Sequence, residues 1–147
     1  MNDYVSFTPI SSKSRTQAGW FNFSRQASSF GNLQLLFDNL WQHNANDYIY
    51  ICGTSDLFYW KPSLNTWYYL VFTFSDNSID SNAKLYVNAV PYGITIQGGG
   101  DIDGVSGLSG SWFSFGGQIS NVSTYNRSLS SAEITQNFNA TKGRYGL

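Results

Sequence analysis

Short alternations of apolar and polar residues recur along this chain, and turn-forming residues separate them. In the segment "DYVSFTPI" (residues 3–10), Val5 and Phe7 alternate with Ser6 and Thr8. A period of two residues is typical of strands that bury one face. Comparable segments follow in this order: "AGWFNFS", "LQLLFD", "DYIYICG", "DLFYW", "AKLYVNAVP", "YGITIQ", "SWFSFGG" and "QISNVSTYNR". About ten strand segments without helical patterns between them predict an all-β fold of packed antiparallel sheets.

The alternation also predicts which side chains share a face. In "AGWFNFS" it separates Trp20 from Phe21 and Phe23, and in "LQLLFD" it groups Leu35 with Phe37. The longest run, "TWYYLVFTFSD", is apolar on both faces over residues 67–74. We therefore expect this run to form a central strand that is covered on both sides.

One segment, "SLSSAEITQNF" (residues 128–138), has the pattern of a helix. Ser130 occupies the N-cap position and Glu133 follows three residues later, which is the spacing of a capping box. Leu129 and Ile134 flank this box at the positions of a hydrophobic staple. The sequence therefore predicts a short helix that begins directly after Ser130.

The same helix is expected to be short and to depend on tertiary contacts. Asn137, Asn139 and Gly143 follow within a few residues, and these residue types favour helix termination. Isolated helices of this length are marginal in water. We therefore expect Ile134 and Phe138 to dock the helix on the β body.

The composition argues against two kinds of binding partner, nucleic acids and membranes. Charged residues make up 12% of the 147 residues, aromatic residues make up 18%, and the net charge is −1. A protein that binds nucleic acid needs a basic patch, and no run of Lys or Arg is present, so we expect no nucleic-acid partner. No apolar run approaches the length that spans a bilayer, and the first residues lack a secretory pattern, so we expect no membrane insertion.

The acidic residues argue against an enzyme. Glycoside hydrolysis normally needs two carboxyl groups that flank the scissile bond. Glu133 is the only Glu, and the capping box accounts for it; the eight Asp residues lie mainly in turns. We therefore expect a protein without catalytic residues.

The single histidine and the single cysteine do not suggest a catalytic pair. His43 lies in the polar stretch "WQHNAND", whereas Cys52 lies in the strand-like run "YIYICG". We interpret His43 as a loop residue and Cys52 as a buried structural thiol. A metal site built from Cys and His is excluded by their number.

A long segment rich in Gly and Ser, "GGGDIDGVSGLSGS" (residues 98–111), interrupts the strand pattern. Long loops on a rigid sheet often carry binding residues. Asp101 and Asp103, followed by Gly104, offer hard oxygen ligands suited to Ca²⁺. A turn without metal explains the same residues, so calcium is one of two interpretations.

Two tryptophans border polar or Gly-rich stretches and are candidates for the surface. Trp41 belongs to the polar stretch "DNLWQHNAND", and Trp112 follows the Gly-rich segment. Exposed aromatic rings suit the apolar faces of sugars, whereas amide groups suit their hydroxyls. Candidate ligand-binding residues are therefore Trp41, Asn44, Tyr59 and Trp112, although Tyr59 could face either the core or solvent.

Three segments together resemble the laminin G-like family of concanavalin A-like jelly rolls: "NTWYYLVFTFSDNS", "AKLYVNAVP" and "GGQISNVSTYNRSLSSAEITQNFNA". The resemblance covers nearly the whole chain and implies one domain, residues 1–147, folded as an antiparallel jelly-roll β-sandwich with one short C-terminal helix. In that family the helix caps an open edge or an end of the sandwich. Ala89 replaces the Gly that usually follows Asn88 in the hairpin, so the turn is expected to differ there.

The ending "NFNATKGRYGL" is similar to laminin G-like modules in structural proteins of tailed bacteriophages. The resemblance implies a non-catalytic, lectin-like module on the capsid or tail surface of a virion, which recognises glycans or a cell-surface polysaccharide. Laminin G-like domains often bind one Ca²⁺ at a rim of the sandwich, a role that Asp101 and Asp103 could fill. One alternative is a structural virion protein, a capsid decoration or tail component, that binds other virion proteins. Another is a module of a larger extracellular adhesin.

Overall fold

The computed structural model describes residues 15–29, 31, 34–37, 40–51, 56–75, 83–95, 97 and 115–147. Its elements, in chain order, are β1 (Arg15–Phe23), the 3₁₀ turn η1 (Ala27–Ser29), β2 (Gln34–Phe37), β3 (Leu40–Gln42), β4 (Ile49–Ile51), β5 (Leu57–Phe58), β6 (Trp67–Phe74), β7 (Lys84–Val87), β8 (Val90–Gly93), β9 (Gly117–Tyr125), α1 (Ser131–Thr141) and the 3₁₀ turn η2 (Lys142–Tyr145). The segment 3–10, Cys52, Trp112 and the segment 98–111 lie outside the described residues.

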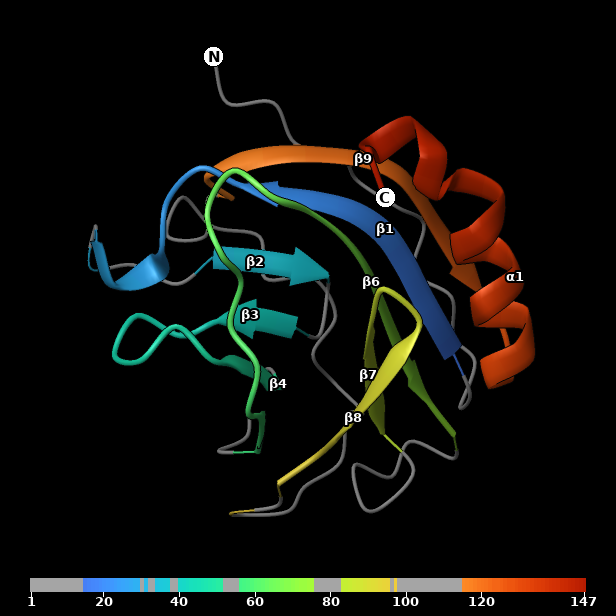
Figure 1. Ribbon diagram of the computed structural model, residues 1–147. Coiled ribbons are helices and arrows are strands. Elements are labelled where there is room, and N and C mark those ends of the chain that lie inside the picture. The colour runs from blue at the N-terminus through green and yellow to red at the C-terminus, as the bar shows by residue number, and fades with distance from the viewer. Residues whose placement is uncertain are drawn as a thin grey trace.

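Two antiparallel sheets form the body of the molecule (Figure 1). The larger sheet has five strands in the order β8-β7-β6-β1-β9, and the smaller sheet has four strands in the order β2-β3-β4-β5. Two hydrogen bonds between Leu57 and Thr95 connect the smaller sheet to the chain that follows β8. The predicted antiparallel jelly-roll sandwich with one C-terminal helix is confirmed.

The core between the sheets is built from the alternation that the sequence shows. Phe21 and Phe23 of β1 point into this core, whereas Trp20 packs on the opposite face of the larger sheet. The predicted separation of these side chains is therefore confirmed. The fully buried or nearly buried members of the core are Phe21, Phe23, Leu36, Phe37, Leu40, Ile49, Ile51, Phe58, Leu70, Phe72, Phe74, Ala83, Leu85 and Val87.

Strand β6 lies at the centre of the larger sheet, between β7 and β1. Leu70 and Phe72 pack against the smaller sheet, and Tyr69 and Val71 pack on the outer face. Both faces of β6 are covered, as the apolar run over residues 67–74 predicts.

Strand β2 departs from simple alternation. Leu36 and Phe37 are adjacent in sequence, yet both belong to the core between the sheets. The pairing of β2 with β3 is irregular between Leu35 and Phe37, and a bulge of this kind lets two consecutive side chains face the same way. The irregular pairing therefore buries two adjacent side chains that a regular strand would place on opposite faces.

Helix α1 begins where the sequence predicts. The Ser130 side chain accepts a hydrogen bond from the Glu133 backbone N–H at 3.3 Å, and the Ser130 backbone N–H donates to Glu133 Oε2 at 2.8 Å. These two bonds form the predicted capping box. Local side-chain chemistry therefore specifies where the helix begins.

The end of the helix differs from the prediction. Asn137 and Asn139 lie inside α1, and Gly143 lies inside η2. The left-handed residue that ends the helical segment is Gly146, with φ of 77°. The contact of Phe138 with Trp20 explains why the helix continues past Asn137 and Asn139, because tertiary packing overrides the weak preference of Asn for helix ends.

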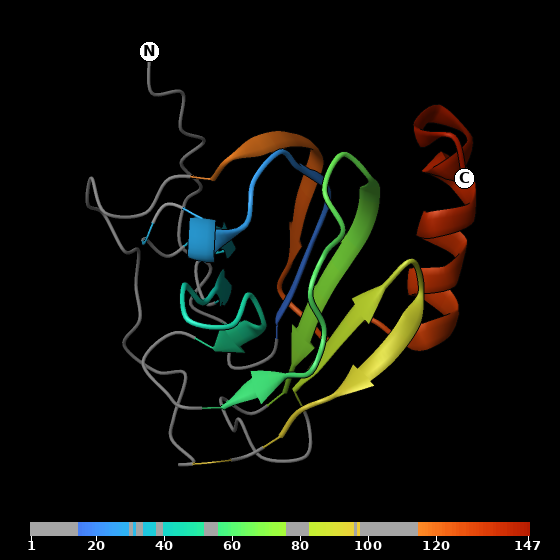
Figure 2. The same cartoon turned by 60° about the vertical axis from the view of Figure 1, so that its left-hand side comes forward.

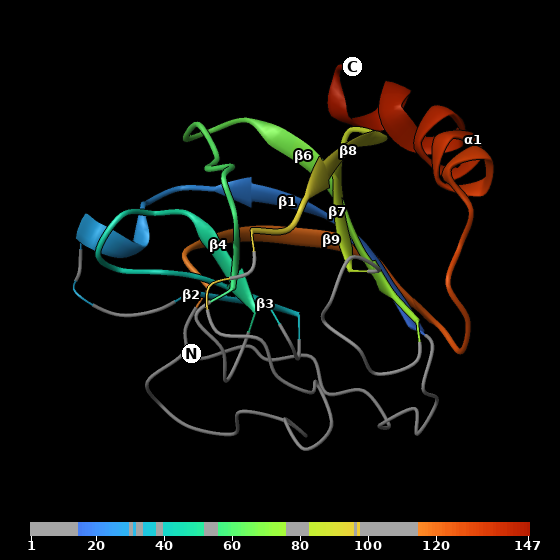
Figure 3. The ribbon, with the colours of Figure 1, turned by 90° about the horizontal axis from the view of Figure 1, so that it is seen from below.

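Helix α1 lies on the outer face of the larger sheet, on the side away from the smaller sheet (Figure 2 and Figure 3). Ile134 is fully buried, and Phe138 stacks on Trp20 with ring centroids 5.9 Å apart. The predicted docking through Ile134 and Phe138 is confirmed. The expectation that the helix caps an edge or end is wrong, because the outward side chains of the central strands are apolar and need cover.

The edge strands are protected in other ways. Pro91 in β8 has no N–H group to offer to a further strand. Strand β9 contains a bulge near Asn121, which has a positive φ of 50°. Prolines and bulges at sheet edges oppose pairing with other chains.

The β7–β8 hairpin turns at Asn88 and Ala89. Their φ angles are 50° and 66°, and positive φ at both central residues is what a type I′ turn requires. The Asn88 side chain accepts a hydrogen bond from the Tyr69 N–H at 2.9 Å. Ala89 therefore adopts the left-handed conformation that favours glycine.

Candidate functional site

The smaller sheet carries an aromatic surface on the side opposite its core. Trp41 in β3 and Tyr50 in β4 are paired across the two strands. Their strand neighbours, including Leu40 and Ile49, are buried in the core. Because side chains alternate along a strand, Trp41 and Tyr50 lie on the outer face.

The loop that joins β3 to β4 extends this surface. The His43 ring lies 4.7 Å from the Tyr50 ring, between centroids. Asn46 Nδ2 donates to the Tyr50 hydroxyl at 2.9 Å, and the His43 N–H donates to the Tyr48 carbonyl at 3.0 Å. Asp47 has a positive φ of 64°, which closes the loop. The loop is thus tied to the strand side chains at several points.

Tyr59 continues the surface beyond β5. Its side chain is 58% exposed, and its ring meets the Tyr48 ring edge-on at 5.3 Å. Lys61 Nζ lies 6.0 Å from the centroid of the Tyr48 ring, within cation–π distance. Trp41, His43, Tyr48, Tyr50 and Tyr59 together are called the aromatic face below.

A buried amide network supports the aromatic face from behind. Gln42 is fully buried, and its Oε1 accepts from the Ala27 N–H at 3.1 Å and from Gln34 Nε2 at 2.7 Å. Its Nε2 donates to the Asp47 carbonyl at 3.1 Å and to Gln26 Oε1. Gln42 therefore links the loop of the aromatic face to β2 and to the start of η1.

The same loop is held at its tip. Asn44 Nδ2 donates to the Gly31 carbonyl at 2.9 Å. The Asp47 carboxylate accepts from the Ser28 N–H at 2.9 Å and from the Ser28 hydroxyl at 2.7 Å. Fixed loops lose less conformational freedom when a ligand binds.

The predicted site residues fall into two groups. Trp41, Asn44 and Tyr59 lie on or beside the aromatic face, and Tyr59 faces solvent rather than the core. Trp112 lies outside the described residues, as do Asp101 and Asp103. Within the described residues, no three His, Cys, Asp or Glu side chains are grouped to hold a metal ion.

Sequence reasoning missed Tyr48, Tyr50 and Lys61. The run "DYIYICG" contained the signal for both tyrosines, because residues two apart in a strand share a face. The supporting role of Gln42 had no local signal, since its partners come from distant parts of the chain.

The described carboxylates have structural partners. Arg127 donates to both Glu133 oxygens, at 2.6 and 3.1 Å. These bonds and those from Ser130 lower the pKa of Glu133 to about 2. A carboxyl group with this pKa is ionised at neutral pH, so it is a poor general acid.

The two packed sheets and the terminal helix define an antiparallel β-sandwich module. The chain belongs to the concanavalin A-like lectin/glucanases superfamily, whose sequence profile matches residues 2–135. The laminin G-like resemblance of the sequence is thereby confirmed. No curated protein matches the chain.

Solved structures share the fold at low sequence identity. One is a protein from Bacteroides ovatus described as a "putative carbohydrate binding protein", with TM-score 0.64 and 16% identity over 87% of this chain and 42% of that chain. A heptameric SAP-like pentraxin from Limulus polyphemus gives TM-score 0.52 and 13% identity over 84% of this chain and 69% of that chain. A Trypanosoma rangeli sialidase gives TM-score 0.54 and 16% identity over 88% and 23%.

Because their sequence identity to this chain is low, these matches show its fold and do not show its function. The chain spans less than half of the Bacteroides ovatus protein and about a quarter of the sialidase. In the described part of the chain, no helix has the length and apolar character needed to cross a membrane.

Proposed function

We propose that this chain is a non-catalytic, lectin-like module that binds a glycan through the aromatic face. The observation that carries the proposal is the gathering of four aromatic residues on the outer side of the smaller sheet: Tyr59 is 58% exposed, and Trp41, Tyr48 and Tyr50 are half-buried. Apolar residues gathered on the outside of a soluble domain commonly mark a binding surface.

The chemistry of the aromatic face suits a sugar. Flat aromatic rings pack against the C–H faces of a sugar ring, and the phenol hydroxyls hydrogen-bond its hydroxyl groups. The side-chain oxygen of Asn44, whose nitrogen is bonded to Gly31, and the cation of Lys61 lie at the border of the face. Binding of this kind needs no proton transfer or bond cleavage.

A glycan array tests this proposal with three proteins: the unaltered chain, Tyr59→Ala and the control Val90→Ala. Val90 is also 58% exposed, but it lies on the edge strand β8. Loss of one stacked ring should weaken binding about tenfold in Tyr59→Ala, whereas Val90→Ala should bind as the unaltered chain does. Absence of any glycan ligand, or equal binding by all three proteins, would contradict the proposal.

The location on a virus particle is a further part of the proposal, and it rests on the C-terminal sequence "NFNATKGRYGL". Mass spectrometry of purified particles should detect the chain on the capsid or tail. Detection there without any glycan ligand would favour the structural role, with other virion proteins as partners. Detection only in an extracellular adhesin of a cell would contradict the virion location.

We also propose that Asp101 and Asp103 bind one Ca²⁺, since their spacing and the following Gly suit such a site. Calorimetric titration should give heat with Ca²⁺ that is lost in Asp101→Asn. No heat with the unaltered chain would contradict the calcium site. This result would not bear on the glycan proposal for the aromatic face.

A further inference from the structure

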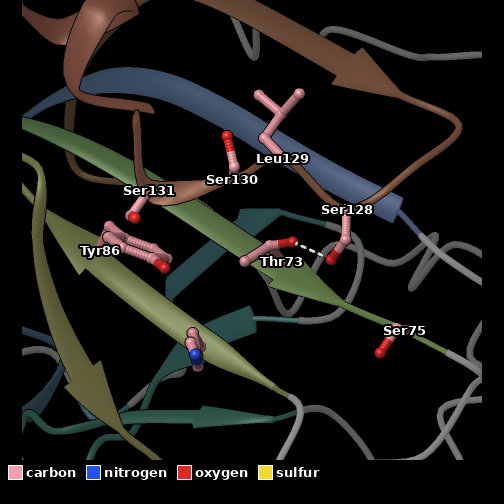
Figure 4. A pocket seen from close by; sticks show the side chains of 8 residues that line it. Thr73, Ser75, Tyr86, Ser128, Leu129, Ser130 and Ser131 are labelled. Atoms are coloured by element: carbon pink, nitrogen blue, oxygen red, sulfur yellow. Dashed lines mark hydrogen bonds between the residues drawn. The ribbon is translucent and has the colours of Figure 1, made fainter. Parts of the chain in front are cut away.

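A hollow of about 290 Å³ lies between the first turn of α1 and the outward side of β6 and β7 (Figure 4). It is on the opposite side of the larger sheet from the aromatic face. Its lining is polar and rich in hydroxyl groups, and the residues used below are Thr73, Lys84, Tyr86, Ser128, Ser130 and Ser131.

Tyr86 points its hydroxyl into this hollow, below Ser131 (Figure 4). The residue is only 4% exposed, and its hydroxyl has no hydrogen-bond partner among the described residues. The ring of Tyr86 is buried, and only its hydroxyl end reaches the hollow. The hydroxyl can therefore donate a hydrogen bond to a group that enters the hollow.

Other hydroxyls of the hollow are already used. Thr73 and Ser128 hydrogen-bond each other, and the Ser130 hydroxyl donates to Glu133. In contrast, the Ser131 hydroxyl has no partner among the described residues. The available donors thus converge from β7 and from the start of α1.

Positive charge lies beside these donors. Lys84 is exposed and forms no ion pair with the described residues. Ser131 and Ala132 are the first two residues of α1, and backbone N–H groups at such positions have no partner within the helix. The positive end of the helix dipole therefore adds to the charge of Lys84.

Among the described residues, the carboxylate near this end of the helix is that of Glu133, and it is paired with a cation. Glu133 is bound by both terminal nitrogens of Arg127 and by Ser130. Its charge is therefore balanced by a neighbouring cation.

We propose that this hollow binds a tetrahedral oxyanion, a sulfate or phosphate group. Lys84 supplies the charge, and the Tyr86 and Ser131 hydroxyls and the first N–H groups of α1 supply hydrogen bonds. The group is either a free anion or a substituent ester on a glycan. The site is separate from the aromatic face and does not depend on it.

NMR titration of the ¹⁵N-labelled full chain with sodium sulfate and with sodium phosphate tests the site, at an ionic strength held constant with sodium chloride. The Ser131 and Ala132 amide signals should shift and saturate. Lys84→Met should weaken binding about tenfold, and Tyr86→Phe should weaken it severalfold while it preserves the packing of the ring. The control Lys142→Met should bind as the unaltered chain does.

A pair of oligosaccharides that differ only in one sulfate ester distinguishes the two sources of the group. Tighter binding of the sulfated member than of inorganic sulfate, lost in Lys84→Met, assigns the site to a glycan substituent. Binding of the inorganic ions alone assigns it to a free anion.

Amide signals that do not saturate with any of these probes, or equal binding by Lys84→Met, would overturn the proposal. Tyr59→Ala should leave anion binding unchanged. Failure of the glycan proposal at the aromatic face is therefore distinguishable from failure at this hollow.

Discussion

At the scale of single residues, the β7–β8 turn places alanine where glycine fits better. Ala89 has φ of 66°, a conformation that is unfavourable for residues with a Cβ atom. Ala89→Gly should therefore stabilise the fold by about 1 kcal/mol, as measured by urea unfolding.

The matched control is Ala140→Gly, because Ala140 is exposed in α1. The same substitution should there destabilise the fold by about 1 kcal/mol. Destabilisation by both substitutions would contradict the account of the turn.

The capping box gives a second prediction at this scale. Arg127 and Ser130 lower the pKa of Glu133 to about 2, below the ordinary value of about 4.3. A carboxyl group whose pKa is lowered on folding stabilises the fold above its unfolded pKa, and this stabilisation is lost as the pH falls through the folded pKa.

Glu133→Gln should therefore be less stable than the unaltered chain at pH 7, and the difference should shrink as the pH falls from about 5 toward 2. Urea unfolding at several pH values measures the difference. Arg127→Gln should show the same trend, and a difference independent of pH would count against the Arg127–Glu133 pair.

At the scale of elements, α1 docks on the larger sheet through one fully buried side chain and through half-buried ones such as Phe138. Ile134 is fully buried among the outward side chains of β1, β6 and β7. Ile134→Asp places an unpaired charge there and should destabilise the fold by about 3 kcal/mol or more, as measured by thermal or urea unfolding.

Gln136→Asp is the control, since Gln136 is exposed on the same helix. It should change the free energy of unfolding by less than about 1 kcal/mol. Equal losses for the two variants would show that helix propensity, and not docking, decides the stability of α1.

Local rules predicted some features of these elements and missed others. The start of α1 was predictable because Ser130 and Glu133 interact within four residues of chain. The end was not, because Phe138 is held by Trp20, which lies in β1. The bulge that buries Leu36 was missed for a similar reason, since pairing with β3 determines it.

At the scale of the whole molecule, β6 is covered on both sides by different partners. The smaller sheet covers one face and α1 covers the other (Figure 2). The apolar run over residues 67–74 predicted that both faces of this strand are covered. The family resemblance, however, led us to expect the helix at an edge or an end of the sandwich. A hydrophobic pattern shows that a face is buried and does not show what buries it.

The candidate site was predictable only in part for the same reason. Trp41, Asn44 and Tyr59 were chosen from their local polar surroundings. Their neighbours Tyr48 and Tyr50 join them through strand pairing, and Gln42 supports the loop through bonds to residues brought together by folding.

The aromatic face is the basis of the proposed function, and one NMR experiment tests it directly. The ¹⁵N-labelled chain is titrated with an oligosaccharide selected on the glycan array, and the anomeric signals of the sugar are followed in the same samples. The account predicts saturable shifts at residues 43–48 and 59–61, with sugar signals that show no cleavage. New reducing-end signals, or shifts that leave these two segments unaffected, would contradict it.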